Sequence, residues 1–295
     1  MGKRALPAFA VAPGEVDLLG EPDDTVISFE PLTVVAETEW VFEPPSDDPF
    51  VRQELAETLY HLVWELVHVF FEHMARSDTG AGASSFLYPF LDAREQDLEA
   101  VVEDVRRSVL MKAGDVADLR AQTLAEGRGE LAAAATALRR AFDAGRKLLA
   151  FGNGGSATDA MDVVADFRAS PQGWPRRPAL DLSEDSAILT ALANDIGPDV
   201  LFQRQVIAYG REGDAVLALS TSGSSANIVE ALAEARRRGL ATVAMVGYDG
   251  GRVAAERLAD HVVVSRSEHI PRIQEAQASA YHVLRELVET APAAP

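Results

Sequence analysis

The sequence LALSTSGSSA, at residues 217–226, decides the interpretation of this chain. An apolar run typical of a buried strand leads into five hydroxyl side chains around one glycine, and a helical pattern begins at Ala226. Hydroxyl groups and the free backbone amides of a helix N-terminus can together bind phosphate without a lysine. A serine-rich loop with a single capping serine is the simpler alternative, but capping needs one hydroxyl and five are present. We therefore expect a phosphate-binding loop at residues 220–225.

The segments around this loop alternate short apolar runs with amphipathic stretches, which predicts an α/β fold with a parallel sheet covered by helices on both faces. In such folds, ligands bind where loops leave the carboxyl ends of strands. A second loop, GNGGS at residues 152–156, follows the first strand, and its glycines permit close approach of a ligand, although alone it also fits an ordinary turn. We expect strands at residues 147–151, 179–182, 215–219, 241–246 and 261–264, and helices at 156–169, 186–192, from 201, 226–238, 251–258 and 272–289.

Two helices are predicted ahead of this region, at residues 95–125 and 129–145, with a break at Gly127-Arg128-Gly129. Apolar residues recur at helical spacing on the first of them, which suits packing between subunits, although packing within one chain gives the same pattern. We therefore assign residues 93–146 to a helical pair for oligomerisation and residues 147–290 to the ligand-binding domain.

Residues 1–92 form an acidic N-terminal extension of a small α+β type. Strand-like segments at 25–29 and 33–42 precede a helix at 50–76, for which Asp48 is the candidate N-cap, and a linker rich in Gly, Ser and Ala follows at 77–85. One stripe of the helix carries His and Glu at helical spacing, which we interpret as a solvated face rather than a metal site. The residues of this stripe are His61, Glu65, His68 and Glu72.

The net charge is −19, and residues 1–95 alone carry 18 acidic and 5 basic side chains. Such a surface repels the phosphates of nucleic acids and anionic lipids, so we expect neither nucleic acid nor membrane as a partner. The acidic extension, residues 1–92, suits docking to a protein partner. The chain has no cysteine, which suits a reducing cytoplasm, the expected location.

Six short motifs follow one another along the chain: GNGGS at residues 152–156, ANDIG at 193–197, GREGD at 210–214, STSGSS at 220–225, GYDGG at 247–251 and RIQE at 272–275. With these motifs in this order, the chain resembles the sugar isomerase (SIS) domain family, and within it the phosphoheptose isomerases, over roughly residues 96–290. Because several separate motifs agree in order and spacing, the resemblance is specific.

The resemblance implies a five-stranded SIS-type sheet and the isomerisation of sedoheptulose 7-phosphate to D-glycero-D-manno-heptose 7-phosphate through an enediol. It also implies a homo-oligomer, a tetramer or a dimer, and a divalent metal, which is zinc in the family. The residues that it would place against the sugar phosphate are Asn153, Gly154, Ser156, Asp195, Ser220, Thr221, Ser222, Ser225 and Gln274.

The resemblance further implies Asp166 and His282 as base and acid, and Asp162, Asp166, Gln274 and His282 as metal ligands. Gln274 and His282 match the family, whereas Asp162 and Asp166 stand where the family has His and Glu. This difference has three interpretations: a metal site richer in oxygen, a base with shorter reach, or loss of catalysis. The last interpretation leaves an alternative function, a non-catalytic SIS regulator or assembly factor that binds a phosphosugar and a partner protein.

Overall fold

The structure is a computed structural model that describes residues 42–75 and 98–290, with side chains over 42–66 and 106–290. The described residues from Pro44 onward belong to one compact unit. The strand-like segments predicted before residue 42 and the linker predicted at 77–85 lie outside the described residues. None of the described helices is both long and apolar enough to cross a membrane.

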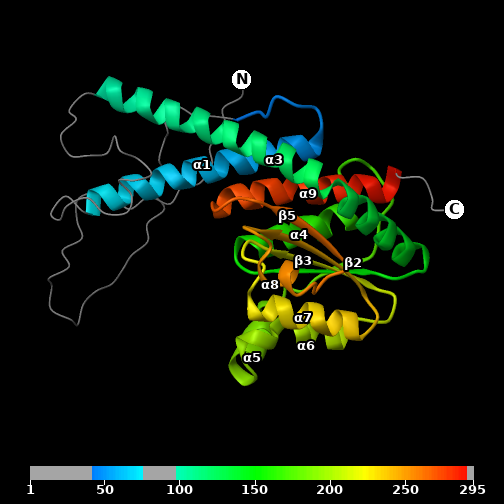
Figure 1. Ribbon diagram of the computed structural model, residues 1–295. Coiled ribbons are helices and arrows are strands. Elements are labelled where there is room, and N and C mark those ends of the chain that lie inside the picture. The colour runs from blue at the N-terminus through cyan, green and yellow to red at the C-terminus, as the bar shows by residue number, and fades with distance from the viewer. Residues whose placement is uncertain (1–41, 76–97, 291–295) are drawn as a thin grey trace, which may run out of the picture. The chain divides into compact units, whose positions relative to one another are not determined.

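Five parallel strands form the sheet, in the order β2-β1-β3-β4-β5 (Figure 1). β1 and β3 pair from Leu148 opposite Ala215 to Gly152 opposite Leu219, so the loops that follow them leave the same edge of the sheet. The predicted α/β fold is confirmed, and each strand lies within one residue of its expected bounds. The strands are β1 (Leu148–Gly152), β2 (Ala179–Asp181), β3 (Ala215–Ser220), β4 (Ala241–Gly247) and β5 (His261–Ser265).

Helices cover both faces of the sheet (Figure 1). One face packs against α3 (Leu98–Asp143), α4 (Gly155–Arg168) and α9 (Ile270–Thr290). α4, which follows β1, and α7 (Ala226–Arg237), which follows β3, lie on opposite faces, so the strand order reverses between these two strands. On the other face lie α5 (Ser186–Asp195), the short 3-10 helix η2 (Pro198–Val200), α6 (Leu201–Tyr209), α7 (Ala226–Arg237) and α8 (Gly251–Ala255).

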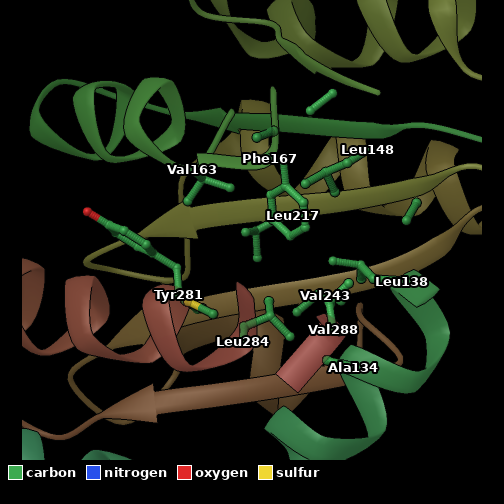
Figure 2. Packing of buried hydrophobic residues seen from close by; sticks show 14 of the residues in the cluster. Ala134, Leu138, Leu148, Val163, Phe167, Leu217, Val243, Tyr281, Leu284 and Val288 are labelled. Atoms are coloured by element: carbon green, nitrogen blue, oxygen red, sulfur yellow. The ribbon is translucent and has the colours of Figure 1, made fainter. Parts of the chain in front are cut away.

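The core beneath α9 is built from closely packed apolar side chains (Figure 2). Phe167 from α4, Leu217 from β3 and Leu284 from α9 are each at most 1% exposed. Full burial of a side chain of this size contributes about 1.5–3 kcal/mol to stability. This layer therefore fixes α4 and α9, which carry the residues predicted for catalysis, against the sheet.

α3 is one continuous helix of 46 residues, so the predicted break and the helical pair are wrong. A Cβ at Gly127 would come within 2.9 Å of Cγ1 of Val263 in β5, whereas a Cβ at Gly129 would meet nothing within 4 Å. Gly127 therefore serves the close approach of α3 to β5 and not a turn. A glycine inside a helix costs about 1 kcal/mol relative to alanine, which is little against the packing of so long a helix.

α1 (Pro49–Ala75) begins at the predicted cap. The Asp48 side-chain oxygen accepts hydrogen bonds from the backbone N–H groups of Phe50 and Val51, at 2.9 and 3.3 Å. The helix packs on α9 and lies within the compact unit that begins at Pro44 (Figure 1). The structure therefore joins α1 to the α/β domain, whereas the sequence assigned it to a separate extension.

The interpretation of the histidine stripe as a solvated face is wrong for the two residues whose side chains are described. His61 is largely buried, with Nδ1 3.0 Å from Glu275 Oε1. Glu65 pairs with Arg272 at 3.0 Å and with Lys112 at 2.7 Å. The stripe thus joins α1 to α9 and α3 through ion pairs. The side chains of the other two members, His68 and Glu72, lie outside the described residues.

Candidate active site

Two loops meet at the carboxyl ends of the neighbouring strands β1 and β3. The side-chain amides of Asn153, after β1, and Asn227, in the first turn of α7, exchange two hydrogen bonds of 2.9 Å. The two amides thereby hold the glycine-rich loop against the helix that follows the serine loop. Because the strand order reverses between β1 and β3, this is the position where open α/β sheets bind their ligands.

The serine loop, residues 220–225, folds around Gly223, whose φ of 59° favours glycine. A Cβ there would also come within 2.3 Å of a carbonyl oxygen. Ser220 Oγ accepts a hydrogen bond from the Gly223 N–H at 3.1 Å, and Ser222 Oγ lies 3.5 Å from Ser225 Oγ. Ser225 precedes α7, but its side chain makes no capping hydrogen bond. Its hydroxyl can therefore serve a ligand, together with the amides of the first turn of α7.

The other residues predicted to contact the sugar phosphate divide into two groups. Thr221 is partly buried in the serine loop, Gly154 and Ser156 begin α4, and Gln274 reaches α4 from α9. Asp195 makes no hydrogen bond to any of them. It is exposed at the end of α5, where its carboxylate accepts a hydrogen bond from Asn194 at 2.9 Å, and α5 lies on the opposite side of the sheet from α9 (Figure 1).

α4 contributes three carboxyl groups at helical spacing, Asp159, Asp162 and Asp166. Asp159 is 4% exposed, and Gln274 donates a hydrogen bond to its Oδ2 at 3.4 Å. Burial raises the pKa of Asp159 to about 7 and that of Asp166 to about 6, and it raises the pKa of Asp162 as well. Asp159 and Asp166 can therefore exchange protons near neutral pH, as general acid–base catalysis requires.

His282 lies between two carboxylates from different helices. Its Nδ1 is 2.8 Å from Oε1 of Glu54 in α1, and its Nε2 is 3.6 Å from Oδ2 of Asp166 in α4. The side chains of His282 and Asp166 are buried, and within the described part of the chain His282 Nε2 and Asp166 Oδ2 have no hydrogen-bond partner. Two buried polar atoms that face each other without partners mark a place for a reacting or bound group.

α1 brings three side chains to this site that the sequence did not predict. The Phe50 ring stacks on the His282 imidazole, with ring centroids 4.4 Å apart. Gln53 donates a hydrogen bond to Asp162 Oδ2 at 3.0 Å, and Glu54 binds His282. The N-cap pattern at Asp48 predicted the helix, but no sequence pattern connects residues that are 228 positions apart.

The four predicted metal ligands do not form a complete site. His282 Nε2 and Asp166 Oδ2 are available, but Asp162 Oδ2 accepts from Gln53, and Gln274 donates to another carboxylate. Within residues 42–66 and 106–290, no group of three or more His, Asp or Glu side chains is arranged to hold an ion. Only two of the four predicted ligands, His282 and Asp166, are therefore available to bind zinc. The mechanism below uses no metal.

Residues 113–247 match the SIS domain family. A phosphoheptose isomerase from Chlorobium phaeobacteroides is 41% identical over 204 residues, which are 68% of this chain and 85% of that protein. Another, from Chlorobaculum parvum, is 46% identical over 164 residues, 54% of this chain and 78% of that protein.

Solved structures agree with these relatives. The phosphoheptose isomerase GmhA from Neisseria gonorrhoeae aligns with a TM-score of 0.58 at 30% identity, over 62% of this chain and 98% of that chain. A phosphoheptose isomerase from Francisella tularensis aligns with a TM-score of 0.58 at 28% identity, over 62% and 97%. The predicted resemblance is confirmed: the chain belongs to the phosphoheptose isomerase family of SIS-domain proteins.

Proposed function

We propose that the protein is an isomerase that interconverts sedoheptulose 7-phosphate and D-glycero-D-manno-heptose 7-phosphate. The observation that carries the proposal is the buried pair of Asp166 Oδ2 and His282 Nε2, which lie 3.6 Å apart and have no hydrogen-bond partner among the described residues. The same domain presents a phosphate-type loop at the reversal of strand order. Kinship with phosphoheptose isomerases supports the same chemistry.

The serine loop would bind the phosphate with neutral donors. The hydroxyls of Ser222 and Ser225 and the amides that begin α7 supply hydrogen bonds, and the dipole of α7 favours the negative charge. The neighbouring cation, Arg252, is paired with Glu256 at 2.7 Å. Because the net charge of the chain is −19, an anion must be bound by local donors such as these hydroxyl and amide groups.

Asp166 and His282 would carry out the proton transfers. Conversion of the ketose to the aldose moves one proton from C1 to C2 and another from the C1 oxygen to the C2 oxygen. Asp166, as a carboxylate, removes the C1 proton while His282, which begins with a proton on each ring nitrogen, donates its Nε2 proton to the C2 oxygen, which gives the enediol. Asp166 then returns its proton to C2, and His282 takes the proton from the C1 oxygen. Both residues end in the forms in which they began.

Turnover of sedoheptulose 7-phosphate by the purified full chain tests this proposal. We expect His282→Ala and Asp166→Asn to lower kcat by about 10²–10⁴-fold, because each removes one proton-transfer group. His269→Ala, at an exposed position before α9, is the matched control and should leave turnover unchanged. Absence of turnover, together with a rise in the melting temperature on adding the phosphosugar, would support the non-catalytic regulator instead.

The same preparation should be assayed for metal. The family implies a divalent metal, for which Asp166 and His282 are the two ligands that this chain keeps available. Because the other two predicted ligands are engaged in hydrogen bonds, we expect turnover to persist after treatment with a chelator. Loss of turnover that zinc restores would contradict the acid–base assignment made here.

We also propose a homo-oligomer, working in the cytoplasm. Large apolar side chains are exposed on α1 and α3, which lie side by side (Figure 1), and they support an interface between copies of the chain. Light scattering should give a mass that is a multiple of 31.7 kDa. The acidic segment within residues 1–92 remains our proposed docking region for a partner protein. The exposed residues are Tyr60, Val63, Trp64, Leu110 and Met111.

A further inference from the structure

Glu54 of α1 is anchored at both of its carboxylate oxygens. Oε1 lies 2.8 Å from Nδ1 of His282, while Oε2 accepts a hydrogen bond from Ser279 Oγ at 2.5 Å and lies 3.7 Å from Nε of Arg120. Ser279 and the guanidinium of Arg120 lie at one oxygen and the imidazole of His282 at the other, so the group is surrounded by donors. This is the environment of a carboxylate that accepts hydrogen bonds at both oxygens.

An ionised carboxylate only accepts hydrogen bonds, so its contact with His282 requires a proton on Nδ1. In a neutral imidazole, this proton leaves the lone pair on Nε2, the nitrogen that faces Asp166. The opposite tautomer would direct a lone pair at the carboxylate of Glu54. The ring of Phe50, stacked on the imidazole at 4.4 Å, keeps its plane fixed. The tautomer and the orientation of His282 are thus both set from α1.

Buried ion pairs farther along hold α1 in this position. Arg272, which is 5% exposed, binds Glu65 of α1 at 3.0 Å. Glu275, which is fully buried, binds both Arg272 at 2.6 Å and His61 of α1 at 3.0 Å. If α1 separated from α9, the buried charges of Arg272 and Glu275 would lose their ion-pair partners on α1, which is strongly unfavourable. Glu54 is therefore a fixed neighbour of His282.

We propose that Glu54 is a positioning residue of the isomerase site, which holds His282 in the Nδ1–H tautomer with Nε2 directed at Asp166 and the substrate. The inference rests on the proposed isomerase function. Glu54 lies outside residues 113–247, the segment that matches the SIS domain family. In this proposal, α1, a helix that precedes the matched domain, contributes Glu54 to the active site.

The test compares Glu54→Gln, Glu54→Asp and Glu268→Gln in the full chain. Glutamine at residue 54 keeps the size of the side chain but can donate as well as accept, so it no longer imposes a tautomer. We expect Glu54→Gln to lower kcat about 100-fold, as loss of an oriented proton-transfer group does, with KM nearly unchanged. Glu54→Asp should restore part of kcat. Glu268→Gln, the matched control, removes a carboxylate at an exposed position before α9 and should leave kcat close to that of the wild type.

A second readout does not depend on turnover. Nitrogen NMR of the full chain, labelled at histidine, distinguishes the two tautomers at a pH where the ring is neutral, and a His282→Asn sample identifies the resonance. We expect the Nδ1–H tautomer in the wild type and in Glu268→Gln, and a shift towards the Nε2–H tautomer in Glu54→Gln.

An unchanged kcat or an unchanged tautomer in Glu54→Gln would overturn the proposal. A higher kcat would overturn it too, because α1 would then be blocking the site. A wild type that does not turn over sedoheptulose 7-phosphate would defeat the proposed function, whereas the tautomer would still decide the role of Glu54. If Glu54→Gln does not fold, as judged by its melting curve, Glu54→Asp carries both measurements, and a wild-type result in both would overturn the proposal.

Discussion

Gly155 at the start of α4 lies directly against Gln274 of α9: a Cβ at residue 155 would come within 2.1 Å of the Gln274 amide nitrogen. That amide also donates to Asp159. Alanine at residue 155 would therefore push Gln274 away from α4. Because the obstacle is the end of a flexible side chain, the fold can absorb the change.

We expect Gly155→Ala to raise KM for the phosphosugar several-fold while stability changes by less than about 1 kcal/mol. A double-mutant cycle with Gln274→Ala checks the reason. Once the amide is removed, the alanine at residue 155 has nothing to displace, so the double variant should have the KM of Gln274→Ala alone. Additive effects on KM would show that the contact is not the cause.

Alanine substitutions at two glycines of α3 should change the stability of the protein in opposite directions. Gly127→Ala places a methyl group 2.9 Å from Val263 and should destabilise the protein by about 1–3 kcal/mol through overpacking. Gly129→Ala meets nothing within 4 Å and should stabilise the protein by about 1 kcal/mol through helix propensity. Urea denaturation of both variants measures the difference, and effects of the same sign would contradict our account of Gly127.

Ser225 and Asp185 both precede helices, but only Asp185 acts as a cap, because its side chain accepts from the N–H groups of Ala187 and Ile188. Ser225→Ala should raise KM about tenfold through the loss of one hydrogen bond to phosphate, with little change in melting temperature. Asp185→Ala should cost about 1 kcal/mol of stability and leave KM unchanged. Thermal melts and steady-state kinetics on both variants separate the two roles; a large loss of stability in Ser225→Ala would make it a structural serine.

Glu57 of α1 should make stability depend on pH. Burial, reinforced by the charge of Asp159, raises the pKa of Glu57 from 4.5 to about 8. Between these values the folded state binds more protons than the unfolded state, so the contribution of this group to the free energy of unfolding falls as pH rises. Glu57→Gln stays neutral, so we expect it to be more stable than the wild type at pH 8, by about 1 kcal/mol or more, and similar to it near pH 4.

Urea denaturation of wild type and Glu57→Gln at pH 4.5 and pH 8 provides the measurement. Glu286→Gln, at an exposed position of α9, is the control. An equal difference between wild type and Glu57→Gln at both pH values would exclude an effect of ionisation.

Local patterns predicted the sheet well and placed the serine loop between β3 and α7, whereas phosphate binding by this loop stays a prediction. Strands such as β3 are short apolar runs bounded by turn residues, and the five hydroxyls of residues 220–225 form a pattern that is recognisable within six positions. The cap at Asp48 was also predicted, because a cap depends on residues two or three positions away. Each of these features is encoded within a few residues.

Features that depend on tertiary contacts could not be predicted. From the sequence alone, Gly127 predicts a break in the helix, and only its contact with β5 explains why a glycine is needed there. From the sequence alone, His61 and Glu65 predict a solvent-exposed face, because their buried partners on α9 are not apparent from local spacing. Glu54 carries no local signal at all, because its meaning comes from His282. Periodicity identifies the faces of a helix, but not which face meets which partner.

The separation of Glu54 and His282 by 228 positions also orders events during synthesis. The ribosome adds about 5–20 residues per second, so His282 of α9 is synthesised roughly 10–50 s after Glu54 of α1. A nascent chain that has reached the end of β5 already holds every strand of the sheet and the phosphate loop, but it lacks Gln274 and His282. Such a chain lacks the partner of Glu54, so the pair of Asp166 and His282 that we propose for proton transfer can form only once the last helix is made.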